Sequence, residues 1–148
     1  IAIGSRRMIH LDQAQTIVTT ALAEGRARLL KPLAAIVLDA GGHPIAFARE
    51  DNATFFRHDI ARAKAYGALG LGQDTRGIAA AASERAGFFQ GVSVTVGGNI
   101  AFSPGGVLVL DGNGRVMGAV GISGDTGDND EICAIAGIKA AGLFGGQA

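Results

Sequence analysis

The chain has 148 residues, with 13 basic and 13 acidic side chains, so its formal net charge at neutral pH is zero. This balance gives no basic surface of the kind that binds nucleic acid or an anionic membrane, and we expect neither partner. The length and a hydrophobic share of 48% predict one domain with its own core. Charged residues interrupt every apolar stretch before it reaches the roughly 20 residues that span a bilayer.

The chain begins without an initiator methionine and without the apolar segment of a signal peptide. We interpret residues 1–7 as residues added by cloning or as a disordered N-terminus, and residues 8–148 as a single domain. The native chain would then begin at Met8 and be cytoplasmic, with an export signal already removed as the open alternative. Cys133 is the single cysteine, which excludes an internal disulfide.

The first elements predict a helix followed by a hairpin. Apolar residues recur at helical spacing over residues 11–30, and Pro32 ends the helix. Residues 33–39 and 44–49 are typical of strands, and the glycine-rich turn between them predicts an antiparallel hairpin.

Two helices are then expected, over residues 56–71 and 75–86, with Thr75 as the cap of the second. One face of the first carries Arg57 and Lys64, two turns apart and about 10.5 Å along the axis. One of these cations could therefore lie at the mouth of a pocket while the other forms an ion pair deeper in the protein.

The remaining elements favour strands and a final helix. Residues 92–96 alternate as in a strand. Residues 107–110 and 115–122 flank an Asp-Gly-Asn-Gly turn, which is a strong hairpin signal. A last helix is expected from Asp128 or Asn129 to about Leu143. Without regular strand–helix alternation, this order predicts an α+β fold in which helices cover an antiparallel sheet of about five strands.

Four motifs resemble, in their order along the chain, the GlcG/HbpS family, which includes the C-terminal domain of PduO-type proteins. They are the hairpin VLDAGGHPIAFAR (37–49), the helix segment IARAKA (60–65), the turn PGG (104–106) and the segment GAVGISG (118–124). The resemblance covers residues 11–143. It implies a profilin-like α+β fold, assembly into homo-oligomers, and a small ligand, since several members are described as haem-binding.

Haem requires an axial donor and an apolar slot. The donors available are His10, His43, His58, Tyr66, Met117 and Cys133. His10 and His43 stand where exposed polar residues are usual, whereas His58 lies in the first turn of a helix beside two phenylalanines. Met117 and Cys133 lie in apolar patterns, where core positions are expected. The family provides no haem-ligand motif that can be transferred residue by residue.

The loop before the last helix is rich in acids. Its carboxylates are Asp125, Asp128, Asp130 and Glu131. Their spacing does not match a calcium-binding loop. Helix capping by Asp128 or Asn129 explains them better, so no metal is expected, and His58, Asp128 and Asp130 form only a weak candidate set.

We predict a pocket walled by the helix start at Arg57, the Pro-Gly-Gly turn and the loop 125–131. Its ligand-binding candidates are Phe56, Arg57, His58, Lys64, Pro104, Gly105, Gly106, Gly124, Asp125 and Thr126. The first hypothesis is a small-ligand-binding protein of the GlcG/HbpS type that takes haem or a related molecule.

The sequence contains no phosphate-binding loop and no nucleophile elbow, which argues against nucleotide binding and against a hydrolase triad. Enzymatic chemistry of another kind is the alternative to ligand binding. A cofactor-free isomerase, lyase or tautomerase would hold a small carboxylated metabolite with Arg57. His58, Asp125 or Glu131 would then move a proton. Two further readings stay open: Arg57 and Lys64 only pair with acids of the terminal loop, or the chain is an assembly subunit.

Overall fold

The computed structural model describes residues 8–146, so the interpretation of residues 1–7 lies outside it. Within this range the elements are α1 (Leu11–Ala27), β1 (Ala34–Asp39), β2 (Pro44–Arg49), α2 (Phe56–Leu71), α3 (Thr75–Glu84), α4 (Ala86–Thr95), β3 (Gly106–Leu110), β4 (Val116–Ser123) and α5 (Gly127–Ala140). The predicted α+β class is confirmed. None of the helices in residues 8–146 is long and apolar enough to cross a membrane.

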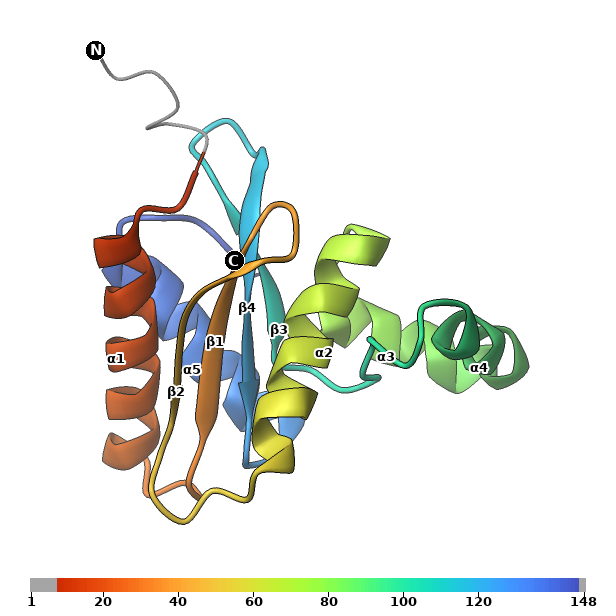
Figure 1. Cartoon of the computed structure of the whole chain (residues 1–148), viewed down its shortest axis with the longest axis horizontal. Coiled ribbons are helices and arrows are strands. Elements are labelled where there is room, and N and C mark those ends of the chain that lie inside the picture. Colours follow the sequence, from red (N-terminus) through yellow and green to blue (C-terminus); the bar gives the residue numbers. More distant parts are fainter. Residues whose placement is uncertain (1–7, 147–148) are drawn as a thin grey trace.

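The two hairpins form one antiparallel sheet with the strand order β2-β1-β4-β3. The strands β1 and β4 are central and almost wholly buried, because helices cover both faces of the sheet. Helices α1 and α5 lie against one face and α2 against the other (Figure 1). Each face therefore has its own apolar core, and the corner between β4 and α5 lies beside α2.

Helix α2 approaches β4 so closely that one position of the strand has room only for glycine. A Cβ on Gly121 would lie 1.9 Å from the carbonyl oxygen of Ala61. Small residues on the inner face of α2, among them Ala65, permit the same approach. This contact brings the backbone of α2 close to β4, so that side chains of α2 reach the end of that strand.

Residues 92–96 belong mainly to α4, which corrects the predicted strand and leaves four strands instead of about five. Alternating valines are typical of a strand, but Val94 is 82% exposed and belongs to no sheet. Helix α4 is held instead by Phe89, which packs with Ile78 and Ile100. These contacts outweigh the modest helix cost of β-branched residues. Helices α3 and α4 project from the body beyond α2 (Figure 1).

Candidate functional site

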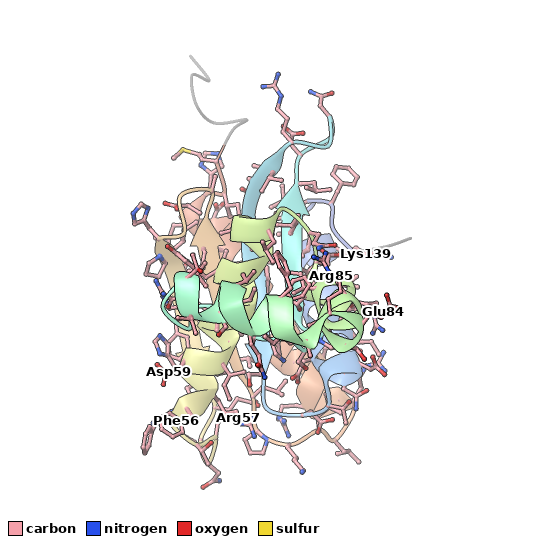
Figure 2. All side chains as sticks on the ribbon, turned by 90° about the vertical axis from the view of Figure 1, so that its right-hand side faces the viewer. Phe56, Arg57, Asp59, Glu84, Arg85 and Lys139 are labelled. Carbon is pink, nitrogen blue, oxygen red and sulfur yellow. The ribbon has the colours of Figure 1, made fainter. Side chains whose placement is uncertain are left out.

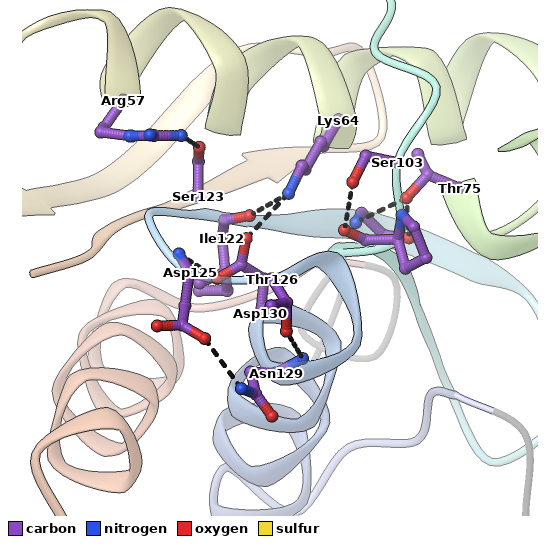
Figure 3. Close-up of polar contacts among 12 residues, drawn as sticks. Arg57, Lys64, Thr75, Ser103, Ile122, Ser123, Asp125, Thr126, Asn129 and Asp130 are labelled. Carbon is purple, nitrogen blue, oxygen red and sulfur yellow. Dashed lines mark hydrogen bonds and ion pairs between the residues drawn. The ribbon is translucent and has the colours of Figure 1, made fainter. Parts of the chain in front are cut away.

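Lys64 lies at the centre of the predicted site and is 3% exposed. Its ammonium group donates to Asp130 Oδ2 at 3.0 Å and to the carbonyl oxygen of Ile122 at 2.9 Å (Figure 3). Burial lowers the pKa of Lys64 and raises the pKa of Asp130, while the attraction between the two charges opposes both shifts. The pair therefore joins α2 to α5, as the reading of Lys64 as an ion-pair partner expects.

The Pro-Gly-Gly turn packs directly against this pair. A Cβ on Gly105, whose φ is +126°, would lie 2.8 Å from Lys64 Nζ and 2.8 Å from the Ile122 carbonyl oxygen. The next residue, Gly106, is held by the buried hydroxyl of Thr75, which accepts from the Gly106 N–H at 2.8 Å. Thr75 thus fastens the turn, whereas Asp74 occupies the cap position predicted for Thr75.

The three predicted walls therefore lie together, but protein atoms fill the space between them at Lys64. Lys64, Gly105 and Gly106 are all buried, so a ligand would contact the exposed residues around them, which we call the rim. Pro104 is half-buried and lies at that rim. A ligand role for these residues stays a prediction.

Arg57 lies at the rim, in the first turn of α2. Its guanidinium donates to Ser123 Oγ at 3.3 Å, and Ser123 is 1% exposed. Within residues 8–146 no carboxylate lies at ion-pair distance from Arg57, unlike Lys64. Figure 2 shows Phe56, Arg57 and Asp59 grouped at one end of the molecule. The structure thus separates the two cations into one at the rim and one inside.

The loop before α5 is ordered by its own side chains. Thr126 is the N-cap of α5 and accepts from the Asn129 N–H at 3.2 Å, which corrects the capping role predicted for Asp128 or Asn129. Asp125 accepts from Asn129 Nδ2 at 2.8 Å and from the Lys31 N–H at 3.0 Å. These bonds, led by the one from Asn129, lower the pKa of Asp125 to about 2.

Gly124 continues this packing on the other side of the loop. Its φ is +152°, and a Cβ there would lie 2.3 Å from the carbonyl oxygen of Pro32. Figure 3 shows the Asp125 carboxylate turned toward Asn129 and away from Arg57. The carboxylate of Asp125, one of the predicted proton-transfer groups, is therefore used in hydrogen bonds that order the loop.

The outer acids of α5 meet a cation that the sequence did not indicate. Arg76 of α3 forms ion pairs with Asp128 and with Glu131, the latter at 3.0 Å. These partners are 52 and 55 residues from Arg76, so no local spacing reveals them. Glu131 thus binds α3 through Arg76.

The possible haem donors differ in accessibility. The His58 side chain is 43% exposed, and its ring lies edge-on to Phe47 with centroids 4.8 Å apart. The His43 side chain is 79% exposed beside Asp39. Met117 and Cys133 are buried, so their predicted core positions are confirmed. Burial also raises the pKa of the Cys133 thiol to about 11.

The weak metal candidates are not brought together. Asp130 pairs with Lys64, Asp128 pairs with Arg76, and His58 lies against Phe47. In the described part of the chain, no group of three or more His, Cys, Asp or Glu side chains is placed to hold a metal ion.

A cavity of about 460 Å³ lies elsewhere, at the outer edge of β3. Of the residues predicted for the site, it contains Glu131 alone.

The sequence and the fold both have recognisable relatives. The model of the HbpS-like family, described as "Haem degrading protein HbpS-like", matches residues 9–139 of this chain. An uncharacterized 15.0 kDa protein of the dhaT–dhaS intergenic region of Citrobacter freundii is 34% identical over 134 residues, covering 84% of this chain and 93% of that protein.

Three crystal structures share the fold. The PduOC–haem complex has a TM-score of 0.83 at 20% identity, covering 93% of this chain and 97% of PduOC. The Klebsiella pneumoniae protein ORFY has a TM-score of 0.79 at 28% identity, covering 90% of each chain. A double mutant of Streptomyces reticuli HbpS has a TM-score of 0.75 at 23% identity, covering 89% of this chain and 86% of HbpS.

Proposed function

The chain belongs to the HbpS-like family, and from this premise we propose that it binds a small ligand, either haem or a related molecule. The observation that carries the proposal is the family match over residues 9–139. It is supported by PduOC, which shares the fold and was crystallised with haem.

The surface around His58 fits the needs of haem, which are a donor and apolar cover. His58 offers an accessible imidazole. The phenylalanines Phe47, Phe55 and Phe56 are 42%, 68% and 63% exposed, which is unusual for such large apolar rings. In this proposal His58 would hold the iron, the phenylalanine rings would cover the porphyrin, and Arg57 would be available to a propionate. Bound haem would supply a redox-active iron.

Titration of the purified protein with haem tests the proposal through the Soret band. We expect saturable binding, with His58→Ala shifting the band and weakening binding by about tenfold or more, since loss of a hydrogen-bond partner of a metal ligand alone commonly costs that much. His43→Ala and His10→Ala are the matched controls and should bind as the wild type does. Absence of a Soret change in the wild type would refute haem, whereas an unaltered His58→Ala variant would refute this ligand alone.

We further propose a homo-oligomer located in the cytoplasm. Apolar side chains exposed on α2 and α4, Phe56 and Phe88 among them, support a partner copy that covers them. The buried free thiol of Cys133 suits a reducing compartment. Native mass spectrometry should give more than one chain per particle, and a monomer at micromolar concentration would contradict the assembly. Fractionation of the host's cells tests the location.

A second candidate is a cofactor-free isomerase, lyase or tautomerase acting on a small carboxylated metabolite. The observation that favours it is Arg57, whose guanidinium has no carboxylate partner in residues 8–146 and so retains donors for a substrate. His58, the next residue, would move the proton. Turnover of small organic acids should be lost in Arg57→Ala and kept in the control Arg85→Ala. If Arg57→Ala only loosens the oligomer, the chain is an assembly subunit.

A further inference from the structure

The cavity of about 460 Å³ lies along the outer edge of β3, beside the start of α3 and one side of α5. In the sheet of residues 8–146, β3 is an edge strand, and Phe144 covers part of its outer side through an antiparallel bridge to Leu110. The start of α3 is also held to the edge: the Leu108 N–H donates to Asp74 Oδ1 at 2.9 Å. This bond fixes a half-buried carboxylate at the cavity wall.

The wall combines hydrocarbon with acidic groups. Leu108, Leu110 and Ile135 supply the apolar part, from both β3 and α5. Asp74 and Glu131 supply two carboxylates. An apolar cavity of roughly 150 Å³ is enough to bind benzene. This one is therefore large enough for an aromatic ring that carries a polar substituent.

The charges of the wall are unequal. Arg76 is the single cation among the lining residues, and Asp128 and Glu131 already share it. Asp74 has no cation at ion-pair distance in the described part of the chain. Its pKa is raised, first by burial and then by the negative charge of Glu131. A positive group placed beside Asp74 would relieve both effects, whereas an anion would be repelled.

We propose that this cavity binds a small organic cation with an apolar body, whose ammonium or amidinium group lies beside Asp74 and Glu131. The apolar body would contact Leu108 and Ile135. Neither His58 nor Arg57 lines the cavity, so binding of a cation there is independent of the haem and organic-acid proposals.

Three probes of one size separate charge from shape: benzylamine, benzyl alcohol and benzoate. Each is titrated into the full chain while methyl resonances of leucine and isoleucine are followed by NMR. We expect benzylamine to shift the methyl groups of Leu108, Leu110 and Ile135, and to bind about tenfold or more tightly than benzoate, since charge-assisted bonds are that strong. Equal binding of benzoate, shifts centred elsewhere, or no binding by any probe would overturn the proposal.

Asp74→Asn removes the charge and keeps an oxygen that accepts from Leu108, so it should fold and bind benzylamine about tenfold more weakly. Glu131→Gln provides a second, independent loss of charge if Asp74→Asn fails to fold. Asp59→Asn is the matched control, because this acid is exposed at the start of α2, outside the cavity. Unchanged affinity in both Asp74→Asn and Glu131→Gln would refute the role of the carboxylates.

Discussion

Asp130 and Glu131 are neighbours in the first turns of α5, yet they end in opposite environments. The inner pair is fully buried, with Asp130 1% and Lys64 3% exposed, whereas in the outer pair the Glu131 side chain is 15% and the Arg76 side chain 51% exposed. Successive helical residues point about 100° apart, so one acid faces β4 and α2 while the other faces α3. The chemistry of the two pairs is alike. Burial therefore decides which pair supports the fold and which remains available at a surface.

Lys64→Met would break the inner pair and should have the largest effect. Asp130 would be left buried without its counter-ion, which costs about 3–5 kcal/mol of unfolding free energy. Urea unfolding followed by circular dichroism measures the loss. The control is the double variant Lys64→Met/Asp130→Leu, in which both charges are gone and most of the stability should return. If Lys64→Met were as stable as the wild type, the expected contribution of the Lys64–Asp130 pair to the free energy of unfolding would be contradicted.

Asp125 sharpens the comparison, because it lies near the inner pair but is only half-buried. Its folded-state pKa of about 2 is below the ordinary value of 3.8. Its stabilising contribution is therefore complete above the ordinary value and is lost as the pH falls toward about 2. Unfolding free energies measured between about pH 5 and pH 2 should fall less steeply in Asp125→Asn than in the wild type. Parallel curves would show that these bonds do not favour the ionised form.

Arg76→Gln tests the outer pair and should have the smallest effect on stability. Exposed ion pairs contribute little to the free energy of unfolding, and salt screens them. The same urea measurement, repeated at high salt, should show the small difference shrinking further. A loss as large as that of Lys64→Met would mean that burial does not separate the two pairs.

Much of the fold could be predicted because its signals are local. Three helices begin where the sequence places them, at Leu11, Phe56 and Thr75. Both hairpins form as expected, since short apolar runs flank turns rich in glycine and aspartate. The four motifs also identify the family, which the comparison over residues 9–139 confirms. The three predicted walls lie together, but Lys64 and Gly105 fill the space between them, and a ligand at this place stays a prediction.

By itself, the sequence determined the element types wherever periodicity and turn residues agree, and through them the α+β class. Only the tertiary structure decided that residues 92–96 lie mainly in a helix, because the contacts of Phe89 with Ile78 and Ile100 override the alternation of the valines. It also decided that Lys64 binds Asp130, 66 residues away. Such partners depend on how α2, β4 and α5 pack, and the spacing of residues within one segment does not predict that packing.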